Sequence, residues 1–419
     1  MALITKAPRG TADVLPAESY KWQHVEQTAL SIARDFGYRE MRTPVFEHTE
    51  LFQRSVGETT DVVQKEMYTF TDRDGRSLSL RPEGTAGVAR SVIENGLYAG
   101  AMPLKLYYLT NFFRYEKPQA GRSREFFQFG TELYGADGPE GDAEVITLAD
   151  RVLRRLGLKS CALRINSIGC ADCRPAYREA LVEYFRAHEP ELCPTCRERL
   201  ETNPLRILDC KSPDCAAIAA GAPKTVEYLC GHCRDHFTRL QKLLDCCGIP
   251  FAVDPRIVRG LDYYTGTVFE FISEGIGAQG TVCGGGRYGG LLSELGGPDM
   301  SGVGFGMGLT RLLLAMQAEG ALPALDGGPQ VYLAPIGDDE RGKAFALTAE
   351  LRALGVRAET DLVGRSLKAQ MKYADKLGAQ NTIVLGTDEL SAGECTLLHM
   401  ATGEKKRIPL SAPSIAENL

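Results

Sequence analysis

Two long runs of β-prone residues restrict the first half of this 419-residue chain to antiparallel strands. The runs Leu104–Tyr115 and Phe126–Tyr134 are rich in aromatic and other residues that favour a pleated sheet. Only a polar loop at 116–124 lies between them, and so short a connection joins antiparallel neighbours. The sequence therefore predicts a long β-hairpin with a basic, mobile tip.

Helical patterns lie on both sides of this hairpin. Apolar residues recur at helical spacing from Tyr20 to Phe36, and the pattern stops at Gly37. A second helix is expected from Asp142 to Leu156. A Gly/Pro break at 326–329 reads as a linker. We therefore expect a first core segment at 1–160, a Cys-rich insertion at 161–250, a second core segment at 251–325, and a separate domain at 329–419.

The tail behind the break alternates strands with helices. Strands are expected at 331–335, 356–360 and 382–385, a hairpin at 395–400 and 405–409, and helices at 343–354 and 366–377. This alternation predicts a small α/β sandwich, which by itself says nothing about chemistry.

Composition excludes some classes of protein. Hydrophobic residues make up 44% and charged residues 24%, as in ordinary globular proteins, and the net charge of −6 excludes a uniformly basic nucleic-acid coat. No apolar stretch approaches the roughly 18 residues of a membrane span, so no membrane partner is expected. Met1–Gly10 carries no apolar signal core, so we expect a cytoplasmic protein. Its 13 cysteines would then be reduced thiols or metal ligands.

The hairpin gathers residues suited to a phosphate and a cation. Arg114 ends one strand and Arg122 lies in the loop, and guanidinium groups bind phosphate with a planar fork. Gln128 and Glu132 share one strand parity and so face the same side. Such a hairpin could hold a nucleotide beside a cationic small molecule, although a charged, solvated sheet edge is the alternative.

Two further segments could supply polar groups to a site. In the first, a Pro-containing turn holds Glu83 and Thr85 at the start of a helix over 86–94, where helix capping is the alternative. In the second, Arg259, Tyr263 and Tyr264 precede a strand at 267–272, where a structural ion pair with an adjacent Asp is the alternative.

Glycines alternate along 302–308, just ahead of Arg311. Alternating glycines leave one face of a strand bare, so that a flat ligand or another backbone can approach. With Arg311 on the first turn of the following helix, this pattern suits an adenine ring lying against a sheet. The alternative is a tight crossing of strands.

Taken together, these segments resemble a known family. Thr43–Glu47, Phe113–Glu116 and Gly304–Leu312 resemble the three motifs of class II aminoacyl-tRNA synthetases, and Leu80–Thr85 with Arg259–Tyr264 resembles the histidyl-tRNA synthetases in particular. The resemblance covers essentially the whole chain. It implies an α+β fold, with an antiparallel class II core flanked by helices, a Cys-rich insertion domain and a C-terminal α/β anticodon-binding domain.

The resemblance also implies a reaction. ATP and L-histidine form histidyl-adenylate and pyrophosphate, and histidine then moves to the 3′ end of histidine tRNA. Arg114 would contact the α-phosphate and the histidine carboxylate, and Arg259 would stabilise charge at the same phosphorus. Arg122 and Arg311 would hold the outer phosphates, with Mg²⁺ beside the pyrophosphate.

Recognition of histidine follows the same resemblance. The α-ammonium would meet Glu83, Thr85 and Gln128. Glu132 would accept a ring N–H while Tyr264, next to Tyr263, meets the other ring nitrogen. The family also implies a homodimer formed through the first motif, and a hairpin tip that meets the acceptor end of the tRNA.

Eight cysteines form four closely spaced pairs inside the expected insertion. Three of the pairs have the Cys-x-x-Cys spacing of structural zinc sites. The sequence predicts one or two Cys₄ zinc sites; reduced buried thiols, a vestigial site and an iron–sulfur cluster are the alternatives. The eight residues are Cys170, Cys173, Cys193, Cys196, Cys210, Cys215, Cys230 and Cys233.

Two other functions remain open from the sequence. One is a catalytically silent paralogue that senses histidine as a regulatory subunit of ATP phosphoribosyltransferase. Such paralogues lose the tail or the arginines, and Arg114, Arg259 and Arg311 are all present here. The other is a zinc-dependent nucleic-acid-binding protein without enzyme activity.

Overall fold

The computed structural model describes residues 5–57, 60–208, 210, 212–257, 261–324 and 327–419. The chain divides into two compact units, Met1–Pro323 and Ala324–Leu419, each of which is described by itself. None of the helices in the described ranges combines the length and the apolar character needed to cross a membrane.

The larger unit is built on an eight-stranded sheet with the order β1-β5-β6-β11-β10-β9-β7-β8. All neighbours from β5 to β7 in this order are antiparallel, and the two edge strands β1 and β8 pair in parallel. The strands are β1 (Arg39–Glu40), β5 (Leu104–Phe113), β6 (Glu125–Tyr134), β7 (Cys161–Ser167), β8 (Phe251–Val253), β9 (Thr267–Ser273), β10 (Thr281–Tyr288) and β11 (Gly302–Gly308).

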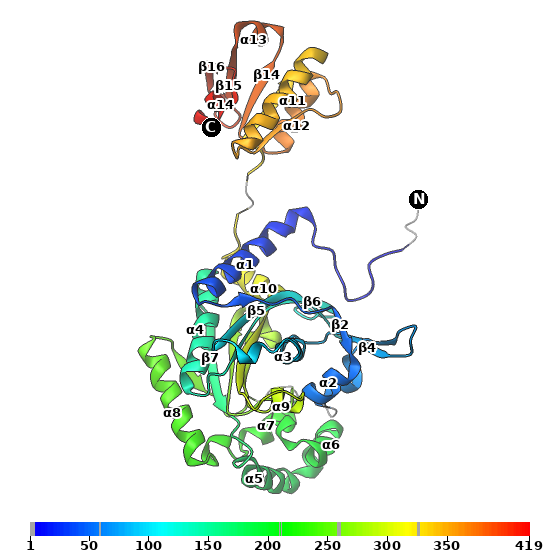
Figure 1. The fold of residues 1–419 in the computed structure, drawn as a ribbon, viewed down its shortest axis with the longest axis vertical. Helices are drawn as coiled ribbons and strands as arrows, with labels where there is room; N and C mark the ends of the chain where they lie inside the picture. Colours follow the sequence, from blue (N-terminus) through cyan, green and yellow to red (C-terminus); the bar gives the residue numbers. More distant parts are fainter. Residues whose placement is uncertain (1–4, 58–59, 209, 211, 258–260, 325–326) are drawn as a thin grey trace. The chain divides into compact units, whose positions relative to one another are not determined.

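The predicted hairpin is confirmed as β5 and β6, and the antiparallel α+β fold class is confirmed with it (Figure 1). A second, three-stranded sheet lies beside it with the order β2-β4-β3. Its strands are β2 (Phe46–His48), β3 (Thr69–Thr71) and β4 (Ser77–Leu80).

Helices pack against both faces of the large sheet. One face carries α1 (Pro16–Asp35), α4 (Pro139–Arg155), α8 (Gly231–Cys246) and α10 (Leu309–Glu319), whose apolar residues share one core with Tyr107, Phe129 and Leu133. The other face carries α3 (Thr85–Glu94), which packs with Leu106 and Tyr108. The predicted helix at 20–36 begins earlier, because Pro16 occupies the first turn, where a missing N–H costs nothing.

The Cys-rich segment folds into short helices around a small apolar core of its own, and none of these helices was predicted. They are α5 (Arg174–Ala187), α6 (Pro194–Thr202) and α7 (Pro213–Ala220), followed by α8. The remaining helices of the larger unit are α2 (Thr49–Val56) and α9 (Leu291–Glu294).

The smaller unit is an α/β sandwich around a five-stranded sheet, with the order β13-β12-β14-β15-β16. Its strands are β12 (Val331–Pro335), β13 (Ala358–Thr360), β14 (Asn381–Leu385), β15 (Glu394–His399) and β16 (Lys405–Pro409), and its helices are α11 (Asp338–Ala353), α12 (Leu367–Lys376), α13 (Thr387–Ala392) and α14 (Ala412–Glu417). The predicted hairpin is confirmed as β15 and β16, whereas α13 and α14 were not predicted.

Candidate active site

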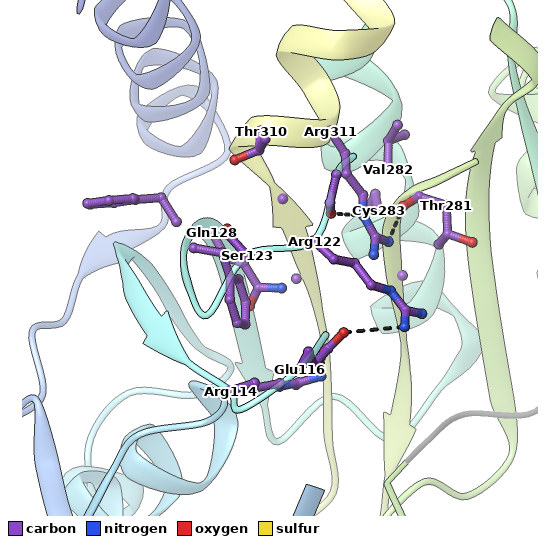
Figure 2. Close-up of a pocket in the computed structure, with 16 residues that line it drawn as sticks. Arg114, Glu116, Arg122, Ser123, Gln128, Thr281, Val282, Cys283, Thr310 and Arg311 are labelled. Carbon is purple, nitrogen blue, oxygen red and sulfur yellow. Dashed lines mark hydrogen bonds and ion pairs between the residues drawn. The ribbon is translucent and has the colours of Figure 1, made fainter. Parts of the chain in front are cut away.

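A polar pocket lies where α10 begins, at the ends of β6, β10 and β11. Figure 2 shows Arg122 reaching it from the β5–β6 loop and Arg311 from the first turn of α10, with Arg114 at the end of β5. The sequence-predicted arginines within the described ranges therefore meet at one pocket. Its lining comprises Arg114, Glu116, Gly121, Arg122, Ser123, Phe126, Phe127, Gln128, Thr281, Val282, Cys283, Gly284, Gly306, Gly308, Thr310 and Arg311.

Each arginine is held by groups around it. Nε of Arg114 donates to the carbonyl of Pro82 at 2.8 Å, and its guanidinium carbon lies 5.5 Å from the ring centre of Phe126. Nη1 of Arg122 lies 3.3 Å from a carboxylate oxygen of Glu116. These contacts fix the guanidinium groups before any ligand arrives, which lowers the cost of ordering them on binding.

Arg311 is the most constrained of the three. Its Nε donates to the carbonyl of Gly121 at 3.1 Å, and Nη1 donates to the carbonyl of Thr281 at 2.8 Å. Burial lowers the pKa of Arg311, and the positive charge of Arg122 lowers it further. The lining residues of the pocket include three guanidinium groups and one carboxylate, that of Glu116, and this excess of positive charge suits a polyphosphate.

Arg259, the fourth predicted arginine, lies outside the described residues. The predicted convergence therefore concerns Arg114, Arg122 and Arg311.

Glu132 lies on the same strand face as Gln128, as its parity predicts, and is 1% exposed. Its Oε1 accepts hydrogen bonds from Oγ1 of Thr85 at 2.8 Å and from the hydroxyl of Tyr108 at 3.4 Å, and its Oε2 accepts one from Tyr288. Burial raises the pKa of Glu132 to about 8, although the hydroxyls of Tyr288 and Thr85 oppose the shift. This carboxyl is thus poised between its two protonation states near neutral pH.

Glu83 caps the N-terminus of α3, which is the alternative role that the sequence left open for it. Its two carboxylate oxygens accept hydrogen bonds from the backbone N–H groups of Thr85 and Ala86, each at 2.8 Å, at the start of α3. The residue is buried, and burial raises its pKa. Each carboxylate oxygen keeps a further lone pair, so capping leaves Glu83 able to accept from a ligand.

Tyr263 and Tyr264 complete an aromatic wall. Both are buried, their ring centres lie 4.6 Å apart, and Tyr263 lies 5.5 Å from the ring of Tyr288. They share one apolar cluster with Tyr108, which itself contacts Glu132. Tyr263 and Tyr264 therefore lie in the same buried cluster as Tyr108 and Tyr288, whose hydroxyls bind Glu132.

The alternating glycines of β11 serve mainly to admit side chains of β6. A Cβ atom at Gly304 would lie 2.2 Å from Oε2 of Glu132, and one at Gly306 would lie 3.3 Å from Oε1 of Gln128. Only at Gly308 would a Cβ atom meet nothing within 4 Å. The predicted bare face is thus open at its pocket end and filled elsewhere, which corrects the sequence-based interpretation.

Sequence reasoning missed several residues of the site. Phe126 shares the strand parity of Gln128, so its place in the lining could have been found from the alternation alone. Tyr108 could not, because its position depends on register: it pairs with Gly130, where a Cβ atom would lie 2.3 Å from its ring. Tyr288 is likewise fixed by its pairing with Gly302.

The eight paired cysteines form two separate groups, and the sulfur atoms within each lie within 4.8 Å of one another. The pairing is nested, because the first and last pairs meet and the two middle pairs meet. One group is Cys170, Cys173, Cys230 and Cys233; the other is Cys193, Cys196, Cys210 and Cys215. All eight are free thiols rather than disulfides.

Comparison with known proteins points to one family. The family model of histidyl-tRNA synthetase matches residues 10–312, and that of an anticodon binding domain matches residues 330–413. The chain is 55% identical to a histidine–tRNA ligase of Caldanaerobacter subterraneus subsp. tengcongensis, over 97% of each chain, and 54% identical to one of Acetivibrio thermocellus, over 97% of this chain and 98% of that one. Among solved structures, that of apo S. aureus histidyl-tRNA synthetase matches with a TM-score of 0.84 and 40% identity, over 99% of each chain.

Proposed function

This chain belongs to the histidyl-tRNA synthetase family, and from that premise we propose that it activates L-histidine with ATP in the arginine-lined pocket and transfers it to its tRNA. The observation that carries the assignment to this pocket is the meeting of Arg114, Arg122 and Arg311 in its lining, together with Gln128 from the strand that also carries Glu132. The smaller unit, matched by an anticodon-binding family model, would read the tRNA at its anticodon.

In the first step, a carboxylate oxygen of histidine attacks the α-phosphorus of ATP, and the bond to the β-phosphate oxygen breaks to release pyrophosphate. Arg114 contacts the α-phosphate and the histidine carboxylate, and Arg259 neutralises charge that develops at that phosphorus. Arg122 and Arg311 hold the outer phosphates, and Arg311 also lies against the adenine. In the second step, a ribose hydroxyl at the tRNA 3′ end attacks the histidyl carbonyl and AMP leaves.

Mg²⁺ would accompany the pyrophosphate group. Proteins hold Mg²⁺ through one or two carboxylates together with substrate phosphates. Two acids fit this requirement: Glu116 lines the pocket, and Glu270 accepts a hydrogen bond from the lining residue Thr281 at 3.0 Å. The ion would neutralise phosphate charge beside the arginines.

Histidine would bind with its α-ammonium toward Glu83, Thr85 and Gln128, and with its ring between Glu132 and Tyr264. A ring N–H donated to Glu132 binds the ionised carboxylate more strongly than the protonated acid, while the Tyr264 hydroxyl can donate to the second nitrogen of a neutral ring. Discrimination then follows because an analogue lacking either nitrogen leaves a buried polar group unpaired.

This geometry makes histidine binding dependent on pH. The donated N–H favours the ionised carboxyl, so histidine lowers a pKa that stands at about 8 without ligand. We therefore expect full affinity above pH 8 and a fall of up to about tenfold for each pH unit below it, measured as the histidine Kd by calorimetry between pH 7 and 8.5. Glu132→Gln should bind weakly but with a flat profile. If the histidine Kd of the wild type were equally independent of pH, the proposed N–H donation to an ionised Glu132 would be wrong.

The roles of the chain segments outside the pocket are also proposed. The insertion at 161–250 would approach the acceptor arm of the tRNA, between core segments at 1–160 and 251–325, and 329–419 would form the anticodon-binding domain. The hairpin tip, with Gln119, Arg122 and Arg124, would meet the acceptor end. We place the enzyme in the cytoplasm, where translation consumes charged tRNA.

We also propose a homodimer, formed through the first motif's helix and strand, and place part of the contact at β2 and just before it. Phe46 and Val45 are 51% and 42% exposed there, and Phe70 of β3 packs edge-on against Phe46. An exposed apolar patch of this kind is typical of an interface. Phe46→Glu should convert the dimer to a monomer in light scattering, whereas Phe345→Glu, at a residue 61% exposed in the smaller unit, should not. If both variants were monomeric, or both dimeric, the proposed interface at β2 would be wrong.

Both cysteine groups are proposed to bind Zn²⁺. Four sulfurs about 2.3 Å from a tetrahedral ion lie about 3.8 Å apart. The sulfur–sulfur distances fit this spacing: 3.6 Å between Cys170 and Cys173, 4.0 Å between Cys170 and Cys230, and 3.9 Å between Cys193 and Cys210. Backbone N–H groups also donate to sulfur, from Cys230 to Cys173 at 3.1 Å and from Cys193 to Cys215 at 3.2 Å, as they do around bound thiolates.

Histidine-dependent exchange of pyrophosphate into ATP tests the central proposal. The purified protein should catalyse exchange with histidine and not without it, and should then charge histidine tRNA. Folded protein that binds histidine but catalyses no exchange would instead favour the regulatory subunit. RNA binding that is lost on zinc removal, with no exchange at any stage, would favour the non-enzymatic alternative.

A further inference from the structure

The two cysteine groups occupy different places in the fold. Cys170 and Cys173 lie between β7 of the large sheet and α5 of the insertion, and Cys230 and Cys233 lie at the start of α8, which packs into the core on that sheet. We call these four the base cluster. The other four cysteines lie within the insertion, where Cys196 and Cys215 belong to its own apolar core. Of the two cysteine groups, the base cluster is therefore the one that joins the end of β7 to the helices that follow it.

The turn carrying Cys170 and Cys173 also holds the backbone next to the tyrosine pair of the pocket. The N–H of Ile168 donates to the carbonyl of Gly266 at 2.8 Å, and the N–H of Gly266 donates to the carbonyl of Gly169 at 2.9 Å. On the other side of the cysteines, Nη2 of Arg174 donates to the carbonyl of Tyr264. Residues immediately before and after this turn thus bind the chain at 264–266.

Apolar packing contributes little to the shape of that turn. The buried cluster around it consists of Cys173, Leu229 and Cys233 alone, with the other two cysteines and Val226 at its edge. The turn is also tight, because Gly169 has a φ of +68° and a Cβ atom there would lie 2.6 Å from that of Cys173. With so little apolar packing, sulfur ligation would add to the backbone hydrogen bonds in fixing the conformation of this turn.

We propose that zinc at the base cluster positions Tyr264, and with it the tyrosine side of the histidine pocket, through Arg174 and the 168–169 backbone. This inference rests on the proposed function and adds a positioning role for a site remote from the phosphates. Loss of this zinc should weaken histidine binding and leave ATP binding nearly unchanged. Loss of the second zinc should affect histidine far less.

Two matched serine variants separate the sites. Cys230 and Cys193 each begin a Cys-x-x-Cys pair and each precede a helix, α8 or α6. Both variants should lose one of two zinc ions by elemental analysis. Cys230→Ser should raise the histidine KM in pyrophosphate exchange about tenfold to a hundredfold, the range seen when supporting contacts are removed, with the ATP KM within about twofold. Cys193→Ser should also raise the histidine KM, but by a factor at least about fivefold smaller than in Cys230→Ser.

A third variant leaves all metal ligands in place. Arg174→Ala removes the contact to Tyr264, so it should keep both zinc ions and its melting temperature while the histidine KM and Kd rise about tenfold. Arg186→Ala is the control, because Arg186 lies on the same helix and pairs only at the surface with Glu201. Its histidine KM should not change.

The outcomes distinguish the two levels of the proposal. Absence of exchange in the wild type would overturn the proposed function. Normal exchange with equal histidine KM changes in Cys230→Ser and Cys193→Ser, or an unchanged KM in Arg174→Ala, would overturn the positioning role alone. Iron in place of zinc, visible as absorption in the purified protein, would overturn the metal assignment.

Discussion

Replacing Arg114 with alanine is expected to lower the rate of pyrophosphate exchange by about 10²- to 10³-fold, the usual loss when one group that stabilises developing charge is removed. The guanidinium is already oriented by the carbonyl of Pro82 and by the ring of Phe126, so it need not reorganise when the phosphorus gains charge. Single-turnover rates of adenylate formation at saturating substrates provide the measurement. The loss should appear in the rate constant more than in the histidine Kd.

Two further variants test whether this effect is specific to the Arg114 guanidinium. Arg114→Lys keeps the charge but not the planar fork, so most of the loss should remain. Arg76→Ala removes an arginine that is 59% exposed at the β3–β4 turn and pairs with Asp72 and Asp74, and should leave exchange unchanged. A loss below about tenfold in Arg114→Ala would show that Arg114 does not act on the reacting phosphorus.

Much of the fold could be predicted because its signals are local. The β5–β6 hairpin follows from β-prone runs of matching length, and β12 from a short apolar run in the smaller unit. The order of the strands could not be predicted from local pattern, since β11 pairs with β6 from a distance of well over a hundred residues. Short helices such as α13 also escaped notice, because six residues give too little periodicity.

The site was predictable where one side chain defines the chemistry. Arg122 and Arg311 were singled out because guanidinium groups bind phosphate with a planar fork and because the family resemblance assigns both to the outer phosphates. The surroundings of Glu132 were not identified: the hydroxyls of Tyr108 and Tyr288 reach it from strands whose register no local pattern gives. The nested pairing of cysteines was hidden for the same reason, since four pairs of similar spacing can combine in several ways.

Glu132→Gln should raise the histidine KM by about 10²-fold or more while the ATP KM stays nearly constant. The amide keeps the volume and one acceptor for the hydroxyls of Thr85 and Tyr108, but it loses the charge that a ring N–H would meet. Steady-state exchange with histidine and ATP varied in turn gives both values. Glu125→Gln, on the same strand and bonded to Asn111 at 2.8 Å, is the matched control and should be close to wild type.

Stability separates this loss from damage to the fold. Burial raises the pKa of Glu132 to about 8, above its value in an unfolded chain, so the folded state holds the proton more tightly and ionising the carboxyl costs stability as pH rises from about 4.5 through 8. A neutral glutamine avoids this cost, so the variant should melt at the same or a higher temperature than wild type at pH 9. A variant that binds histidine normally, or that fails only because it melts early, would remove Glu132 from ring recognition. If the variant instead binds histidine weakly and is at least as stable as wild type, the loss of binding is due to the lost charge.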